Sequence, residues 1–261
     1  MVGEPVGLVV AADEGLRPAA AALAERFGLR FADSSEGQAF PIFVLTASGL
    51  EARLGAGDRG RVLRIDFTEA GLERRARRAR GEAVVRAVAA HSISGGLVCD
   101  ATAGLGVDSF LLVSAGFDVI ALERNGGIAA MLCDGVMRAG RYPELKAMFD
   151  ARFRVVHADA RAWLQGARRG EQERPDVVYL DPMFAPRDGA ALVRGAMRDL
   201  RAVVGDDADD AALLDAALGA ARRRVVVKRM HDAPPIAHGS ARVHHELRDG
   251  VVRFDVYEMT G

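Results

Sequence analysis

Apolar runs of strand length alternate with stretches of helical spacing from Gly95 onward. The strand-like runs are Leu97–Ala101, Asp118–Leu122, Arg154–Ala158, Val177–Leu180 and Arg224–Val227. The helical stretches between them are Asp108–Ala115, Ile128–Ala139, Arg161–Gln165 and Ala190–Val204. Alternation of this kind predicts a parallel sheet with helices on both faces, the doubly wound α/β class.

The end of the chain has a different pattern. Two alternating runs, Arg242–Leu247 and Val251–Glu258, flank the dipeptide Asp249-Gly250. Asp-Gly between alternating runs is a strong hairpin signal, because a tight turn needs residues that tolerate positive φ. We therefore expect a mostly parallel seven-stranded sheet that ends in an antiparallel hairpin. The acidic stretch Gly205–Asp210 predicts a surface loop.

The beginning of the chain is typical of a separate, small α/β domain. Helical spacing over Glu14–Phe27 predicts a helix that Gly28 ends. The short runs that read as strands are Val6–Val10, Leu29–Ala32, Ile42–Thr46 and Val62–Phe67. The predicted organisation is an N-terminal domain at 1–68, a basic linker helix at 69–94 and the main domain at 95–261.

The linker is predicted to be helical over Glu69–His91, although Gly71 and Gly81 weaken the pattern. Five arginines occur within seven residues: Arg74, Arg75, Arg77, Arg78 and Arg80. They form either a solvated helix face or a patch that contacts nucleic-acid phosphates, and the run alone favours neither reading.

Composition narrows the class of protein. Half of the 261 residues are hydrophobic and the net charge is -1, which excludes disorder along the whole chain and a strongly basic protein. Only Cys99 and Cys133 occur, which excludes a disulfide scaffold and fits a reducing, cytoplasmic location. No apolar run is long enough for a membrane span, and the acidic N-terminus argues against a signal peptide. The histidine spacing predicts no metal site.

Candidate cofactor chemistry begins after the first strand of the main domain. Asp100 leads into a turn with Gly104 and Gly106, where the backbone can bend tightly and approach a ligand. The helix that follows offers free N–H groups. Glu123, at the end of the second strand, could accept hydrogen bonds from ribose hydroxyls. Alternatively, the glycines serve an ordinary turn and Glu123 caps the strand end.

The type of cofactor follows from the polarity of the turn. A dinucleotide site expects a third glycine where this chain has Ser109, and Asp108 would repel a diphosphate. A carboxylate there better suits a cationic or zwitterionic ligand, such as the methionine end of S-adenosylmethionine. Asp159 could accept a hydrogen bond from adenine, or it could be the N-cap of the next helix.

The strongest candidate motif follows the fourth strand: Asp181, Pro182, Met183 and Phe184. Asp181 and the Pro182 carbonyl could accept the two hydrogens of an exocyclic amine, while Phe184 stacks on a planar base. Such contacts would aim the nitrogen lone pair at a methyl donor, so catalysis would be mainly positioning. The alternative is an ordinary Asp-Pro turn with Phe184 in the core.

Together these motifs resemble the ribosomal small subunit methyltransferase J family. The resemblance rests on Asp-Ala-Thr-Ala-Gly-Leu-Gly, Leu-Glu-Arg-Asn, Val-Tyr-Leu-Asp-Pro-Met-Phe and Val-Val-Val-Lys-Arg, and it covers about Asp66–Tyr257. It implies a Rossmann-like class I methyltransferase domain that uses S-adenosylmethionine to methylate the N2 of a guanine in 16S rRNA or the small ribosomal subunit. The cofactor contacts that it implies are Val107, Asp108, Glu123, Arg124, Asp159, Ala160 and Asp181.

The resemblance also suggests RNA contacts at Arg187, Lys228 and Arg229. The family usually has Arg where this chain has Val107, and Pro with a basic pair where it has Ala185-Pro186-Arg187. Two other functions stay open from the residues. One is amine methylation of DNA adenine, protein glutamine or a small molecule, and the other is a non-catalytic rRNA-binding assembly factor.

Overall fold

The computed structural model describes residues 7–36, 41–54, 61–89, 95–182, 210–236, 239 and 242–259. Their contacts divide the chain into two units. Unit 1 comprises the described residues within Met1–Asp66 and Asn125–Arg141. Unit 2 comprises those within Phe67–Arg124, Tyr142–Phe184 and Asp207–Gly261. The arginine-rich segment thus groups with unit 2, and the helix after Asn125 groups with unit 1.

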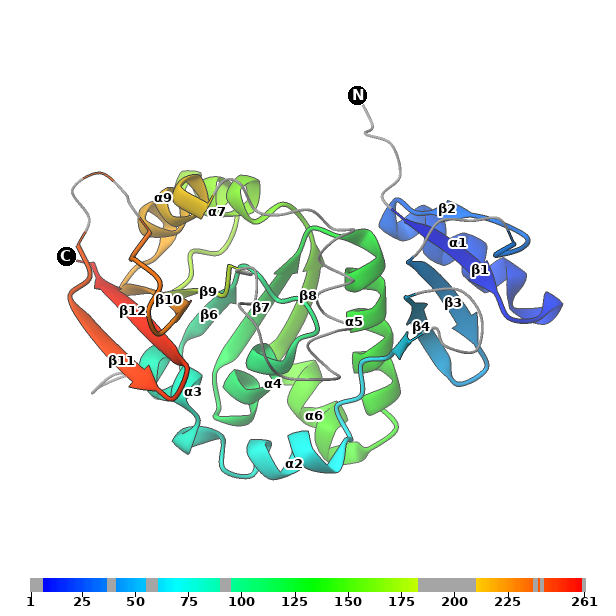
Figure 1. Cartoon of the computed structure of the whole chain (residues 1–261), viewed down its shortest axis with the longest axis horizontal. Coiled ribbons are helices and arrows are strands. Elements are labelled where there is room, and N and C mark those ends of the chain that lie inside the picture. Colours follow the sequence, from blue (N-terminus) through cyan, green and yellow to red (C-terminus); the bar gives the residue numbers. More distant parts are fainter. Residues whose placement is uncertain are drawn as a thin grey trace. The chain divides into compact units, whose positions relative to one another are not determined.

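Unit 1 contains a five-stranded sheet in the order β2-β1-β3-β4-β5 (Figure 1). The strands are β1 (Leu8–Ala11), β2 (Arg30–Phe31), β3 (Ile42–Thr46), β4 (Gly49–Arg53) and β5 (Val62–Leu63). β1 is parallel to β2 and β3, whereas β4 is antiparallel to both of its neighbours. The sequence did not predict β4, which follows β3 after a two-residue turn.

Two helices belong to unit 1, α1 (Arg17–Phe27) and α5 (Gly126–Ala139). α1 starts later than predicted, because a 3-10 turn capped by Asp13 occupies Glu14–Leu16. It ends as predicted at Gly28, whose φ of 63° is left-handed. α5 packs closely through glycine: a Cβ at Gly127 would lie 2.0 Å from the Phe43 ring.

Unit 2 contains a seven-stranded sheet in the order β11-β12-β10-β9-β6-β7-β8. The strands are β6 (Leu97–Asp100), β7 (Asp118–Glu123), β8 (Phe153–His157), β9 (Val177–Leu180), β10 (Arg224–Met230), β11 (His245–Asp249) and β12 (Val252–Glu258). β6 to β10 pair in parallel, and β12 runs antiparallel to β10 and β11. The predicted parallel sheet with a terminal hairpin is therefore confirmed.

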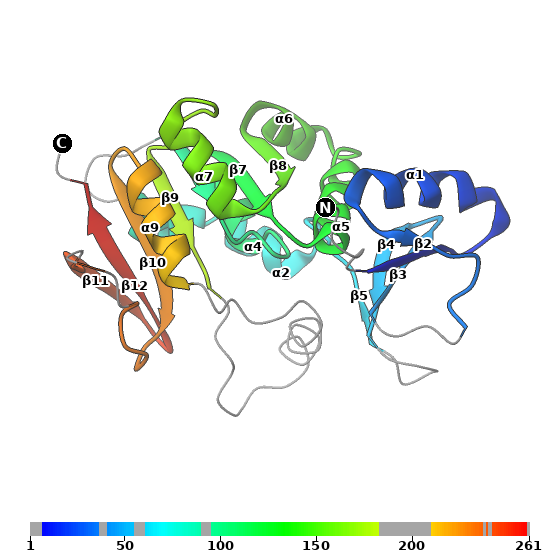
Figure 2. The ribbon, with the colours of Figure 1, turned by 90° about the horizontal axis from the view of Figure 1, so that it is seen from above.

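Helices cover both faces of this sheet (Figure 1). They are α2 (Ala70–Ala76), α3 (Ala83–Ala89), α4 (Val107–Ser114), α6 (Pro143–Arg152), α7 (Ala160–Arg169) and α9 (Asp210–Ala220). α7 and α9 lie side by side on one face (Figure 2), where Trp163 and Leu214 join the strand residues in one core cluster. On the other face Phe67, Phe110 and Phe149 pack ring against ring.

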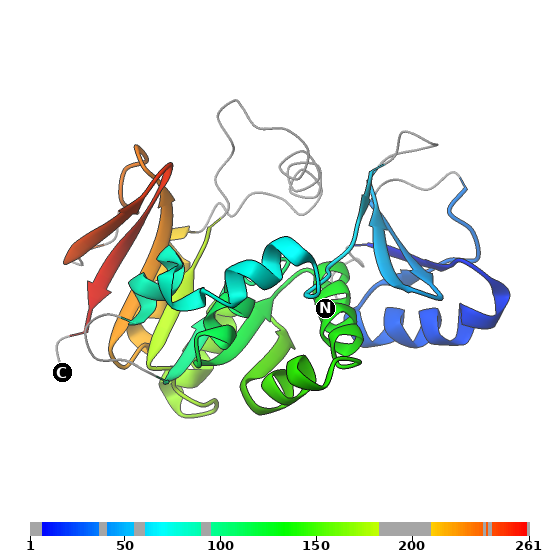
Figure 3. The same cartoon turned by 90° about the horizontal axis from the view of Figure 1, so that it is seen from below.

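The single helix predicted over Glu69–His91 is wrong. The segment consists of α2, a 3-10 turn at Ala79–Gly81 and α3, all packed near α4 (Figure 3). Arg78 leaves helical geometry at φ -117° and ψ 22°, and Glu82 is extended. Gly81 lies at the second break, as its low helix propensity allows. Helices α6 and α9 were not predicted, and Ala190–Val204 and residues 205–209 lie outside the described part of the chain.

Candidate cofactor and acceptor site

The predicted glycine turn connects β6 to α4. Gly104 has φ 52° and Gly106 has φ 76°, both left-handed, so these two positions need glycine. The Gly106 N–H donates to the Ala103 carbonyl at 2.8 Å, and the Ala103 N–H donates to Leu122 of β7 at 3.0 Å. The turn is therefore anchored to the neighbouring strand and directs the start of α4 toward the carboxyl end of the sheet.

Glu123 is the last residue of β7 and lies beside this turn. Its Oε2 accepts a hydrogen bond from the Gly104 N–H at 3.0 Å. The adjacent strand is also tied to it, because the Ala158 N–H donates to the Glu123 carbonyl at 3.1 Å. The contact places a half-buried carboxylate at the turn, where the sequence predicted a partner for a ribose.

Asp100 lies buried at the end of β6 and stabilises the turn. Its Oδ2 accepts from the Ser109 hydroxyl at 2.5 Å, and its Oδ1 accepts from the Thr102 N–H at 3.2 Å. Burial raises the pKa of Asp100 to about 7, and the Asp108 and Asp181 charges add to this effect. Ser109 therefore binds Asp100 at the position where a dinucleotide fold has its third glycine.

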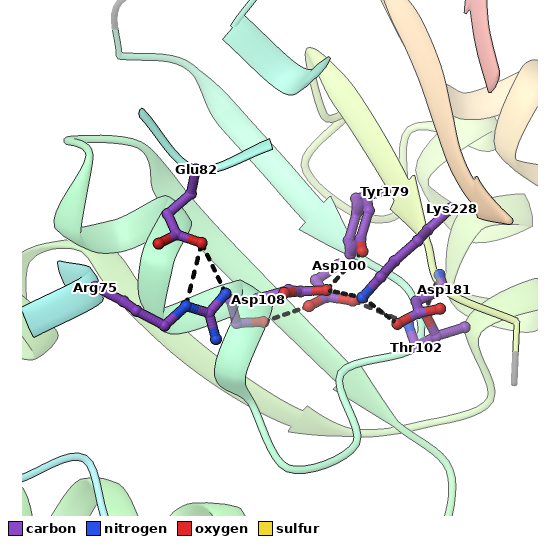
Figure 4. Close-up of polar contacts among 9 residues, drawn as sticks. Arg75, Glu82, Asp100, Thr102, Asp108, Tyr179, Asp181 and Lys228 are labelled. Atoms are coloured by element: carbon purple, nitrogen blue, oxygen red, sulfur yellow. Dashed lines mark hydrogen bonds and ion pairs between the residues drawn. The ribbon is translucent and has the colours of Figure 1, made fainter. Parts of the chain in front are cut away.

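A network of two carboxylates and one ammonium lies next to Asp100 (Figure 4). Lys228 Nζ donates to Asp108 Oδ2 at 2.8 Å and to Asp181 Oδ2 at 2.9 Å. We refer to Asp108, Asp181 and Lys228 as the carboxylate–lysine cluster. Burial lowers the pKa of Lys228, but the two carboxylates outweigh that effect, so its pKa lies above the ordinary value.

The register of the sheet brings this cluster together. Val227 of β10 is paired with Leu180 of β9, so the next residues, Lys228 and Asp181, are neighbours across the two strands. Two further residues secure the cluster. Thr102 Oγ1 accepts from the Asp181 N–H at 2.7 Å, and the Tyr179 hydroxyl donates to Asp108 Oδ2 at 2.7 Å. Burial raises the pKa of Tyr179 well above its ordinary value, so its hydroxyl stays protonated and remains a donor.

Sequence reasoning missed Thr102 and Tyr179 and assigned Lys228 to RNA. A usable signal was present, since aligning the ends of Val177–Leu180 and Arg224–Val227 as parallel neighbours places Lys228 opposite Asp181. Arg229, which was also assigned to RNA, is not exposed at the strand end. It is buried and donates to the Pro234 carbonyl, with Asp210 Oδ2 at 3.9 Å.

The remaining predicted cofactor contacts lie at helix starts and strand ends. Asp159 is the N-cap of α7 and accepts from the Ala162 N–H at 2.9 Å, which is the structural alternative for this residue. Its carboxylate is also 44% exposed, so the cap leaves it accessible to a ligand. Ala160 and Val107 begin α7 and α4, and the Arg124 carbonyl lies 3.2 Å from His157 Nε2.

The predicted RNA-contacting arginines divide into two groups. Arg75 binds Glu82 through two nitrogens at 2.8 and 3.1 Å, and Arg77 pairs with Glu73 on α2. The other three, Arg74, Arg78 and Arg80, are exposed and form no ion pair with any residue that the structure describes. Arg187 and the motif residues Met183 and Phe184 lie outside the described residues, whereas Pro182 is described and buried.

The described side chains also bear on metal and membrane binding. Among them, His, Cys, Asp and Glu form no group of three or more suited to a metal ion. None of the helices in the described part of the chain is both long and apolar enough to span a membrane.

The donor set of this site fits S-adenosylmethionine. The turn supplies backbone N–H groups, and Glu123 supplies a carboxylate where a ribose would lie. The carboxylate–lysine cluster supplies both signs of charge, as an amino acid zwitterion with a sulfonium requires. Glu123, Arg124, Asp159 and Ala160 would hold the nucleoside part, and the turn with Asp108 would hold the methionine part.

Comparisons with known proteins agree with this reading. The model of the family described as "Putative SAM-dependent methyltransferase" matches residues 22–259. Ribosomal RNA small subunit methyltransferase J of Thioalkalivibrio sulfidiphilus is 43% identical over 248 residues, which cover 94% of this chain and 95% of that protein. The Chromohalobacter salexigens protein of the same name is 41% identical over 252 residues, 95% of each chain.

The fold has a solved relative as well. The crystal structure of a SAM-dependent methyltransferase from Neisseria gonorrhoeae superposes with a TM-score of 0.73 at 30% sequence identity. The superposition covers 96% of this chain and 95% of that one. The similarity therefore extends over both units of the chain.

Proposed function

The chain belongs to the ribosomal RNA small subunit methyltransferase J family of S-adenosylmethionine-dependent enzymes, and from this premise we propose its reaction. It transfers a methyl group from S-adenosylmethionine to the exocyclic N2 of a guanine in 16S rRNA. The observation that carries the proposal is the placement of Asp181. It lies at the carboxyl end of β9, bound through Thr102 to the cofactor turn and through Lys228 to Asp108.

The chain's own residues supply alignment. S-adenosylmethionine, when bound, supplies an electrophilic methyl group. Asp181 accepts a hydrogen bond from the guanine amine, the Pro182 carbonyl accepts the other hydrogen, and Phe184 stacks on the base. These contacts direct the nitrogen lone pair along the line of attack, which lowers the barrier by positioning. The amine becomes acidic only as the N–C bond forms, so no strong base is needed beforehand.

The target guanine must leave its stack for this geometry, because a paired base does not present its amine to a pocket. We infer that the enzyme works on 16S rRNA within the cytoplasm, as free RNA or as part of the small subunit. Arg74, Arg78 and Arg80 are the proposed phosphate contacts, since clustered cations displace the counterions of RNA.

The test is transfer of a labelled methyl group to 30S subunits and to naked 16S rRNA from a strain that lacks this enzyme. The RNA is then digested, and its nucleosides are identified by mass spectrometry. Label in N2-methylguanosine is expected. Label only in DNA adenine, protein glutamine or a small amine would refute the RNA substrate, and cofactor binding without transfer to any substrate would favour an assembly factor.

The RNA surface has its own test with a matched control. We expect the double variant Arg74→Gln/Arg78→Gln to weaken rRNA binding about tenfold or more and to reduce its salt dependence. Arg75→Gln/Arg77→Gln removes the same charge from arginines already paired with Glu82 and Glu73, so its effect should be smaller. Filter binding at several salt concentrations measures both. Equal losses in the two variants would contradict the assignment.

A further inference from the structure

Lysine is nearly absent from this chain, since 33 of its 35 basic residues are Arg. One of the two lysines, Lys146, pairs with Asp150 on the exposed surface of α6. The other, Lys228, is only 24% exposed and touches carboxylates from two different elements. A lysine ammonium is a compact charge with three donors, whereas the planar guanidinium of arginine favours one bidentate partner. Position 228 therefore suits an ammonium.

Negative charge exceeds positive charge around Lys228. The charged groups that contact it are Asp108 on α4 and Asp181 after β9. Around these two carboxylates lie Asp100 on β6, Tyr179 on β9, which donates to Asp108, and the Arg75–Glu82 pair. Asp100 already titrates with a pKa of about 7, because burial and its acidic neighbours disfavour its charge. Without Lys228, the same repulsion would act on Asp181.

We propose that Lys228 is a positioning residue for methyl transfer, which holds the Asp181 carboxylate beside the cofactor turn and keeps it ionised. This role rests on the proposed function, and it links the cofactor side of the site to the acceptor side. Asp108 belongs to the cofactor side of the site and Asp181 to the acceptor side, and one ammonium contacts both. Lys228 therefore acts through Asp181 and not by contact with RNA phosphate.

The two roles differ in their kinetic signatures. A phosphate contact contributes to RNA binding, so its loss raises KM and reduces the salt dependence of binding. A positioning residue contributes after binding. When Lys228 is replaced by Met, the pKa of Asp181 should rise, because its carboxylate loses the neighbouring cation. The ionised carboxylate of Asp181 is a stronger acceptor for the amine than the protonated acid, so the acidic limb of the kcat profile moves to higher pH.

The first experiment measures kcat and KM for methyl transfer across pH in K228M, K228R and K146M. For K228M we expect kcat at pH 7 to fall about tenfold or more, the acidic limb to move up by about one pH unit, and KM for RNA to change little. K228R restores the charge and hence the pH profile, but only part of kcat, because a guanidinium does not reproduce both contacts of the ammonium. K146M should match the wild type. A raised KM with the wild-type pH profile in K228M would overturn the proposal.

The second experiment needs no substrate and compares the thermal unfolding of K228M and K146M from pH 5.5 to 8. A carboxylate whose pKa is raised in the folded protein makes the protein less stable as pH rises. The loss of thermal stability in K228M relative to K146M should therefore grow with pH. A deficit independent of pH would mean a purely structural role. Should K228M fail to fold at every pH, the double variant D108N/K228M, which has one carboxylate fewer, is expected to fold. Failure of that variant also overturns the proposal.

These results separate the two proposals. If the wild type methylates no rRNA, the proposed function fails, while the unfolding comparison still decides whether Lys228 balances the two carboxylates. If rRNA is methylated and the acidic limb and the unfolding deficit of K228M do not respond as described, only the assignment of Lys228 fails.

Discussion

Unit 2 buries charge in two regions that differ in composition and in origin. The carboxylate–lysine cluster combines two anions with one cation from three separate elements at the carboxyl ends of parallel strands. On β12, Arg253 and Asp255 form a close pair on a single strand, and Glu246 Oε1 on β11 lies 3.8 Å from Arg253 Nε. Arg253 Nε donates to Asp255 Oδ1 at 2.6 Å and Nη2 donates to Oδ2 at 3.2 Å.

The pair on β12 is closed to solvent, whereas the carboxylate–lysine cluster is open to it. Both side chains of the Arg253–Asp255 pair are at most 6% exposed, and Arg253 also donates to the His231 carbonyl at 2.8 Å. Asp181 in the cluster is 37% exposed and lies at the carboxyl end of the sheet, where open α/β folds bind their ligands. Buried charge alone therefore does not indicate a functional site; the feature on which we base our proposal is excess charge of one sign at an accessible strand end.

The largest effect should come from breaking the closed pair. Asp255→Asn leaves the buried Arg253 guanidinium with only the more distant Glu246 carboxylate, at 3.8 Å, as its anion, which we expect to lower the free energy of unfolding by about 3 kcal/mol. The double variant Arg253→Met/Asp255→Leu removes both charges and should be much less destabilised. Denaturant unfolding measures both. A loss below about 1 kcal/mol in Asp255→Asn would show that the pair does not stabilise the strand.

The next largest effect should be a loss of methyl-transfer activity when Asp181 of the open cluster is changed. Asp181→Asn should lower kcat about 100-fold, about 2.7 kcal/mol in activation free energy, because the neutral amide oxygen is a weaker acceptor than the carboxylate and does not offset the positive charge that develops on the amine. Its stability should change little, since the side chain is partly exposed and one negative charge fewer relieves repulsion. Asp150→Asn, on the exposed surface of α6, is the control. A folded Asp181→Asn enzyme with full methyl transfer would remove Asp181 from the acceptor site.

The smallest effect per pH unit concerns the pH dependence of stability next to the open cluster. Asp100 has a pKa of about 7 in the folded protein against an ordinary value of 3.8. The folded state therefore binds a proton that the unfolded state lacks, and stability falls as pH rises from about 4 to 7. Its slope is at most about 1.4 kcal/mol per pH unit. In Asp100→Asn this contribution should vanish. Identical slopes in thermal unfolding would show that Asp100 is ionised at neutral pH.

Local patterns were sufficient for much of the fold. The apolar runs of unit 2 became strands whose ends lie within three residues of the predicted ends, because buried parallel strands need apolar side chains on both faces. The Asp249-Gly250 turn formed the predicted hairpin, and Gly104 and Gly106 adopted the left-handed backbone that their type permits. Asp100, Glu123 and Asp181 were placed at strand ends by the same reasoning.

Other features depended on contacts between distant segments. The break at Arg78 and Glu82, the grouping of α5 with the first sheet and strand β4 all arise from packing that no local pattern encodes. Asp159 illustrates the limit within the site, since the sequence allowed both a cap and a ligand contact, and the structure supplies the cap.

By itself, the sequence determined the α/β class, the terminal hairpin and the glycine turn, because each follows from the conformational preferences of neighbouring residues; the acceptor motif stays a prediction. Which charged side chains pair with one another was decided only by the tertiary structure. Lys228 and Asp108 are separated by 120 residues and meet at 2.8 Å because β9, β10 and the start of α4 converge at one end of the sheet. Attraction between charges depends on distance in space, which strand order and register set.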